Sequence, residues 1–386
     1  MRLSLPTILL CAMMLSLAAG ARADDYPPLK HGVSLSSWFA GAPRQPLLER
    51  DFIQIQQAGF DHVRLSVDPM QIGFMLNPYQ HGLATTDFTR MDKAIHLATD
   101  RGLAVVLDIH PNPRFMKALE EWEWTENEFA TFPAAIAKRY KDIPPSLLAF
   151  ELLNEPQYYG QEAQYDRFMR KLVAAVRKVD AKRLLIVDGP HGSSLDGLEL
   201  IQPIDDAAIL YGFHFFEPDI ITHQGTSSGF ENTAIPYLSM VPYPSSQVVF
   251  DARTCAKYYL KKIEAQRELD DYVLQGWNDK HIAARIARAR AWADKHHVRV
   301  VCGAFGVLRT HISPESRYRW IEDTRKALEA SGIGWEIWDY SDLFGITSLI
   351  GKLSPPDPID GSVWLMDVAH GFRALEPEAL SALGLQ

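Results

Sequence analysis

The residues best placed to do chemistry are Asn154 and Glu155, which follow an apolar run and precede Pro156. The run 147–153 is typical of a buried strand, so we expect it to present an amide and a carboxyl group at its C-terminal end. A carboxyl group at the mouth of a buried strand suits acid/base chemistry in a cleft. These residues alone define no function, so the elements around them have to be considered.

Short apolar runs alternate with stretches of helical period along the whole chain after residue 30. We expect helices over 46–58, 88–101, 126–140 and 163–179, and strands over eight runs: 31–36, 62–67, 104–110, 147–156, 183–188, 209–216, 298–305 and 334–340. This alternation predicts a (β/α)8 TIM barrel in a single domain. A doubly wound open sheet is the alternative, but it usually has fewer strands and a glycine-rich first turn, which this sequence lacks.

The spacing is regular except for a long insertion at about 219–290, between the sixth and seventh runs. It contains two expected helices and Trp277. Loops at the C-terminal face of a barrel build the cleft, so one interpretation is that the insertion shapes substrate binding. The other is that it forms an additional packing layer.

Residues 1–23 have the form of a signal peptide, with a basic start, an apolar stretch and the small-x-small end Ala21-Arg22-Ala23. A membrane anchor is the alternative, but the apolar stretch is short. We therefore expect a mature domain over 24–386, periplasmic or secreted, monomeric and not associated with the membrane. Loss of Arg2 and Arg22 leaves a net charge of about −11, which argues against a nucleic-acid partner.

Two cysteines remain in the mature chain, Cys255 and Cys302. A disulfide between them is possible in an oxidising compartment, whereas the strand-like surroundings of Cys302 favour two free buried thiols. We find no metal-ligand spacing and no nucleotide, haem or flavin signature, and we expect no cofactor.

Polar and aromatic residues gather where the expected strands end: Arg64, Asp68, His110, Asn154, Glu155, His214, Phe216, Ala304 and Trp338. In a barrel these ends meet at one cleft. Aromatic faces cover the C–H surface of a sugar ring, while amide, imidazole and guanidinium groups bind its hydroxyls. The set therefore indicates a carbohydrate site, with a polysaccharide or oligosaccharide as partner.

This ordered set resembles glycoside hydrolase family 5, the cellulase-type retaining glycosidases. The resemblance implies that Glu155 is the acid/base and that Asn154 binds the 2-hydroxyl of the sugar at the cleavage point. It further implies that Arg64, His110 and His214 are hydrogen-bonding or nucleophile-supporting groups and that Trp338 is a sugar platform. We predict all four as substrate contacts, together with Phe216, Trp38 and Tyr158. The implied reaction is double displacement between two carboxyl groups about 5 Å apart.

The chain departs from the family pattern at the seventh strand, where Gly-Glu-Phe-Gly is replaced by Gly303-Ala304-Phe305-Gly306. The family's nucleophile is that Glu, and a methyl group can neither attack the anomeric carbon nor stabilise its positive charge. Phe216 similarly stands where many relatives have a Tyr whose hydroxyl contacts the nucleophile. Two interpretations stay open: an engineered knockout of an active β-glycanase, or a natural polysaccharide-binding pseudoenzyme linked to exopolysaccharide metabolism.

Two further carboxylates and four further aromatic residues have candidate roles of their own. Glu151 and Glu336 share strand parity with Glu155 and Trp338, and we expect buried ion pairs or hydrogen bonds for them, because buried charges need partners. Trp122, Trp124, Tyr159 and Trp277 are candidates either for binding further sugar units or for ordinary packing.

Overall fold

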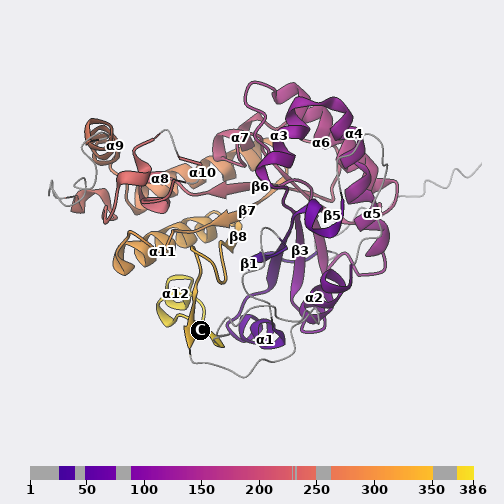
Figure 1. Ribbon diagram of the computed structural model, residues 1–386, viewed down its shortest axis with the longest axis horizontal. Coiled ribbons are helices and arrows are strands. Elements are labelled where there is room, and N and C mark those ends of the chain that lie inside the picture. The colour runs from indigo at the N-terminus through magenta and orange to yellow at the C-terminus, as the bar shows by residue number, and fades with distance from the viewer. Residues whose placement is uncertain are drawn as a thin grey trace, which may run out of the picture.

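Eight parallel strands form a closed barrel in the computed structural model (Figure 1). The structure describes residues 26–39, 48–74, 88–227, 229–230, 233–248, 262–350 and 372–386. The barrel strands follow chain order: β1 His31–Phe39, β2 His62–Val67, β3 Ala104–Ile109, β4 Leu148–Glu151, β5 Leu184–Asp188, β6 Ile209–Phe215, β7 Arg299–Phe305 and β8 Gly334–Ile337. β1 pairs with both β2 and β8, which closes the ring and confirms the predicted (β/α)8 fold.

Helices surround the barrel, as Figure 1 shows. On the first half of the chain they are α1 Glu49–Gln57, α2 Thr89–Thr99, α3 Pro113–Glu121, α4 Glu123–Phe129, α5 Thr131–Arg139, α6 Glu162–Arg177 and α7 Leu195–Leu200. The second half contributes α8 Asp219–Thr222, α9 Lys262–Gln275, α10 Asp279–His296, α11 Pro314–Ala330 and α12 Pro377–Ala382. Short 3-10 turns lie at Pro69–Ile72, Ile235–Tyr237 and Ser245–Gln247, and an antiparallel ribbon joins β9 Thr347–Ile350 to β10 Phe372–Leu375.

The predicted boundaries differ from the structure in two informative places. The expected helix over 126–140 is two helices, which break at Ala130; Pro133 lies in the first turn of α5, where a missing N–H costs nothing. The fourth strand ends at Glu151, so Asn154 and Glu155 lie in the turn beyond it rather than on the strand. Because they lie in a turn, their side chains need not point to alternate sides as they would on a strand.

Two aromatic residues of the long insertion, Tyr243 and Trp277, pack against the outer helices of the barrel. Trp277 is buried and its ring contacts His281 at the start of α10, with centroids 4.2 Å apart. The Tyr243 hydroxyl donates to Asp323 on α11. This supports the packing-layer interpretation of these residues and excludes a surface sugar contact for Trp277.

The barrel interior holds buried charge, and His62 is one example. Its ring lies between Asp61 and Glu336, with 3.2 Å from Nε2 to the Glu336 carboxylate. Gly32 leaves room for it, because a Cβ at residue 32 would lie 2.1 Å from His62 Nε2. Burial alone would lower the pKa of His62, but the two carboxylates outweigh it and raise the pKa to about 9.

This proton should make the free energy of unfolding depend on pH. The folded state keeps the His62 proton up to about pH 9, whereas the unfolded chain releases it near pH 6.5. The contribution, at most about 3 kcal/mol, is therefore complete below pH 6.5 and is lost as the pH rises through 9. Urea unfolding at several pH values from 6 to 10 should show this slope reduced in His62→Asn and unchanged in the exposed control His96→Asn. An unaltered slope in His62→Asn would contradict the assignment.

Candidate active site

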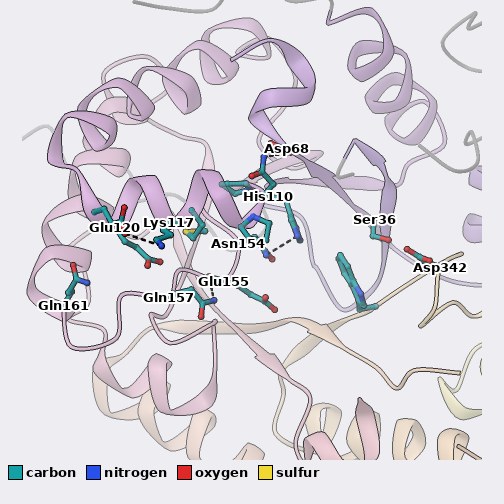
Figure 2. Close-up of a pocket in the computed structure, with 16 residues that line it drawn as sticks. Ser36, Asp68, His110, Lys117, Glu120, Asn154, Glu155, Gln157, Gln161 and Asp342 are labelled. Carbon is teal, nitrogen blue, oxygen red and sulfur yellow. Dashed lines mark hydrogen bonds and ion pairs between the residues drawn. The ribbon is translucent and has the colours of Figure 1, made fainter. Parts of the chain in front are cut away.

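A cleft of about 760 Å³ opens at the C-terminal end of the barrel. Of the residues selected from the sequence, His110, Asn154, Glu155, Trp338 and Asp68 line it. Figure 2 shows that the cleft extends from Ser36 and Asp342 on one side, past these residues, to the α3 side chains Lys117 and Glu120 on the other. Residues far apart in the sequence therefore converge as predicted from the strand ends.

Glu155 lies in the turn after β4 with a φ of 44°, a left-handed conformation that residues other than glycine rarely adopt. Its side chain is 43% exposed, and Oε1 lies 2.9 Å from His214 Nδ1. Burial raises the pKa of this carboxyl group, but His214 outweighs burial through its hydrogen bond and charge. The net pKa lies below the ordinary value, so Glu155 is ionised at neutral pH in the unliganded protein.

Arg64 lies beneath the cleft, fully buried, and holds the floor of the site together. Its Nε donates to Glu151 Oε2 at 2.7 Å, and a second nitrogen, Nη2, donates to the other Glu151 oxygen. Nη2 also donates to Asn154 Oδ1 at 2.8 Å and lies 3.1 Å from Asp108. The expectation of a buried ion pair for Glu151 is confirmed, and so is the expected pairing of Glu336, which contacts His62 and lies 3.5 Å from Arg64.

These contacts orient the groups that face the cleft. Arg64 donates to the oxygen of the Asn154 amide, so the amide nitrogen of Asn154 points towards His110 Nε2, 3.3 Å away. His110 is held from the other side by Asp108, at 2.9 Å from Nδ1. The His110 ring also stacks on Trp338 with centroids 5.8 Å apart and planes 14° apart. An amide, an imidazole and an indole are thus fixed around one end of the cleft.

Arg64 and His214 were predicted as substrate contacts, and the structure corrects this. Arg64 has no exposed surface and His214 only 3%, and neither lines the cleft. Arg64 is bound by Glu151 and Asp108 below the cleft floor, and His214 is bound through Nδ1 by Glu155. Both therefore act on the site by positioning Asn154 and Glu155.

Tyr158 is a second correction. It is fully buried, and its ring packs against Tyr165 and Phe168 rather than facing the cleft. The neighbouring Tyr159 is 64% exposed and stacks on His191 with centroids 4.4 Å apart. Tyr158 has a φ of 38°, so the chain is not extended here and strand alternation does not predict which tyrosine faces outward.

Two further predicted substrate contacts, Phe216 and Trp38, and the two cysteines remain to be placed. Phe216 is half-buried and packs edge-on against Phe344 and His214, and it is not among the residues that line the cleft. The backbone of Trp38 belongs to β1, but its side chain lies outside the described residues. Cys255 also lies outside them, while Cys302 is buried and free.

Ala304 lies on β7 in register with His214 of β6 and is 1% exposed. The adjacent Gly303 also faces His214, since a Cβ there would lie 3.4 Å from Nε2. Within the described chain, several buried polar atoms of this part of the barrel have no hydrogen-bond partner, among them Arg64 Nη1, His214 Nε2 and Asp188 Oδ1. Next to His214, which positions Glu155, the barrel therefore has the methyl group of Ala304 and side-chain nitrogens that lack a hydrogen-bond partner.

Sequence reasoning missed Asp108 and Asp188. Asp188 ends β5 and lies 3.7 Å from His214 Nε2, and its strand-end position was the available signal. Burial and the neighbouring Glu151 raise the pKa of Asp188 well above its ordinary value. Glu151, Asp188 and His214 could together offer three ligand atoms to a metal ion, but Arg64 already binds both oxygens of Glu151, and its charge opposes a cation there.

A closed barrel that joins a carboxyl group, an amide, an imidazole and an indole in one cleft defines a site of the glycoside-hydrolase class. The chain belongs to the cellulase family, glycosyl hydrolase family 5, whose model matches residues 25–343. Endoglucanase C of Acetivibrio thermocellus is 30% identical over 305 residues, covering 77% of this chain and 84% of the relative. Cellodextrinase A of Ruminococcus flavefaciens is 24% identical over 319 residues, covering 79% and 83%.

Solved structures agree on the fold. A cellobiose complex of a mutant form of Cel5A from Thermotoga maritima has a TM-score of 0.70 at 22% identity, covering 92% of this chain and 96% of that one. The cellulose synthase subunit Z of Clostridioides difficile has a TM-score of 0.68 at 23% identity, covering 92% and 99%. Among the described residues of the present chain, no helix combines the length and apolar composition needed to cross a bilayer.

Proposed function

We propose that this chain binds a β-linked glucan or a related polysaccharide in the cleft and, as its sequence stands, hardly hydrolyses it. The observation that carries the proposal is the methyl group of Ala304, which lies in register with His214, the residue that holds Glu155. A retaining mechanism needs a second carboxyl group across the bond from the acid/base. Ala304 is where the family pattern places it.

The electrostatics of Glu155 support the same proposal. In a retaining pair, the negative nucleophile raises the pKa of its partner, which can then donate a proton to the leaving oxygen. Here the pKa of Glu155 is lowered, because His214 outweighs burial and no opposing carboxylate lies at residue 304. Glu155 is thus an acid/base without the neighbour that would keep it protonated.

The roles of the other cleft residues follow from their contacts. Trp338 would carry the apolar face of the sugar, and the Asn154 amide, oriented by Arg64, would bind its 2-hydroxyl. In the active form of the family reaction, Glu155 would protonate the leaving oxygen and then activate water. Export through residues 1–23 would bring the domain to extracellular polysaccharide.

A natural pseudoenzyme is the second candidate, in which binding itself is the function. Two departures from the family pattern favour this candidate: Ala304 in place of a Glu and Phe216 in place of a Tyr. Both remove the same contact, the one between the tyrosine hydroxyl and the nucleophile carboxylate. The structural likeness to a cellulose synthase subunit fits a role in exopolysaccharide metabolism. The native codon for residue 304 distinguishes this candidate from an engineered knockout.

Binding by the chain as it stands tests the proposal. Isothermal titration calorimetry with cello-oligosaccharides should detect binding, and Trp338→Ala should weaken it about tenfold or more, because the sugar loses its aromatic platform. Asn154→Ala should weaken it as well. The control Leu274→Ala removes a side chain that is 85% exposed on α9 and should leave the affinity unchanged. Absence of binding to gluco- and manno-oligosaccharides alike would refute the proposal.

A further inference from the structure

Two tryptophans lie on the corner between α3 and α4, outside the site described above. Trp122 is 51% exposed and Trp124 is 37% exposed, although large aromatic side chains usually bury most of their surface. Their rings are nearly parallel, with centroids 6.3 Å and planes 12° apart. We refer to this pair as the tryptophan corner.

The corner has a firmly held backbone. Trp122 ends α3 and precedes α4 in an extended conformation, and its N–H donates to Ala118 O at 3.2 Å. The buried Thr125 hydroxyl lies 2.7 Å from Ala118 O and 2.6 Å from Trp122 O. Exposed rings on an ordered corner lose little conformational entropy when a ligand covers them.

The corner continues the cleft. Lys117, Glu120 and Glu121 of α3 line the cleft, and Trp122 is the next residue along the chain. Figure 2 places Lys117 and Glu120 at the end of the cleft opposite Ser36 and Asp342. A polymer that leaves the cleft over the end of α3 therefore meets the tryptophan corner.

The charges around the corner define what it can bind. Glu121 and Glu123 flank Trp122 and are exposed, and Lys117 forms an ion pair with Glu121. Such a surface repels nucleic acid and anionic lipid. Indole rings with hydroxyl-binding carboxylates beside them suit the C–H faces and hydroxyls of a neutral sugar chain.

We propose that the tryptophan corner is a distal subsite that holds the part of a neutral β-linked polysaccharide extending beyond the cleft. The inference rests on the proposed function, since it assumes that the cleft binds the same polymer. It adds a requirement for length: a trisaccharide occupies the cleft alone, whereas a polymer also covers the corner.

The test compares two ligand lengths, cellotriose and a soluble mixed-linkage β-glucan, by calorimetry and affinity electrophoresis. The double variant Trp122→Ala/Trp124→Ala should bind the polymer about tenfold more weakly and cellotriose unchanged. Trp122→Phe/Trp124→Phe keeps aromatic faces and should restore much of the polymer affinity. Both pairs are exposed, so thermal unfolding should match that of the parent protein.

The outcomes separate the inference from the proposed function. Unchanged polymer affinity in the alanine pair, with intact cellotriose binding, overturns the inference and leaves the proposed function standing. Failure of the parent protein to bind either ligand overturns the proposed function and this subsite with it. If the alanine pair instead changes only the mass measured by size-exclusion chromatography with light scattering, the corner is a protein contact and the inference is wrong.

Discussion

Replacement of Ala304 by Glu should produce hydrolysis of soluble β-glucan, of which we expect the parent protein to catalyse next to none. The new carboxyl group would supply the missing nucleophile opposite Glu155 and would also raise the pKa of Glu155. Loss of such a group typically costs on the order of 10⁴-fold or more in rate, so a gain of at least about 10³-fold is expected. Reducing-end release measures it, and NMR of the first product should show retained anomeric configuration.

Matched variants show whether the gain comes from the carboxyl group. Ala304→Gln adds the same volume without a nucleophile and should stay inactive. Ala304→Glu/Glu155→Gln should lose the gain again, because the leaving oxygen is no longer protonated. Ala304→Glu/Phe216→Tyr adds the hydroxyl that many relatives place near the nucleophile and should match or exceed the single variant.

The glycanase proposal fails under a clear condition. If Ala304→Glu and its Phe216→Tyr combination both fold, bind cello-oligosaccharides and release no reducing ends from any β-glucan or mannan, the cleft does not support retaining hydrolysis. Binding without such rescue would favour the pseudoenzyme.

Arg64→Met should destabilise the fold by about 3–5 kcal/mol, the cost of leaving buried carboxylates without their cation. Arg64 is paired with both Glu151 and Asp108, which are buried. Urea unfolding measures the effect. It should shrink as the pH falls, because the unpaired carboxyl groups have raised pKa values in the folded variant and gain protons there before the unfolded chain does.

A surface pair provides the control. Arg139 contacts Asp92 with two nitrogens as well, but the side chains are 41% and 29% exposed, so Arg139→Met should cost about 1 kcal/mol or less. Arg64→Met/Glu151→Gln should recover part of the loss, since one buried charge is removed. Equal destabilisation by Arg64→Met and Arg139→Met would show that the buried carboxyl groups are neutral in the parent protein. The same Arg64→Met variant should weaken oligosaccharide binding, because the Asn154 amide loses the donor that orients it.

Much of the fold followed from hydrophobic pattern alone. Parallel strands buried on both faces appear as continuous apolar runs, and β2, β3 and β6 begin where their runs begin. The closed topology also followed, since eight such runs separated by helices have one common architecture. The break of the helix at Ala130 did not follow from this pattern.

The site residues themselves could be predicted only in part from the sequence. Strand ends identified Glu155, Asn154, His110 and Trp338, and all four line the cleft. The depth of a side chain did not follow from the sequence. Arg64 and His214 have equally polar side chains but lie below the cleft floor, where Arg64 is bound by Glu151 and Asp108, while His214 is bound by Glu155. Proximity in three dimensions, rather than residue type, separates a sugar contact from a positioning residue.

The sequence by itself determined the barrel, the order of polar groups at its strand ends and the methyl group at residue 304, because these depend on residue type and local period. Only the tertiary structure decided which groups reach the cleft. In the turn after β4, where Glu155 and Tyr158 have positive φ, Tyr158 is buried and Tyr159 is exposed, and Arg64 is buried against carboxylates. Such choices arise from contacts between elements distant in sequence, which a one-dimensional pattern does not contain.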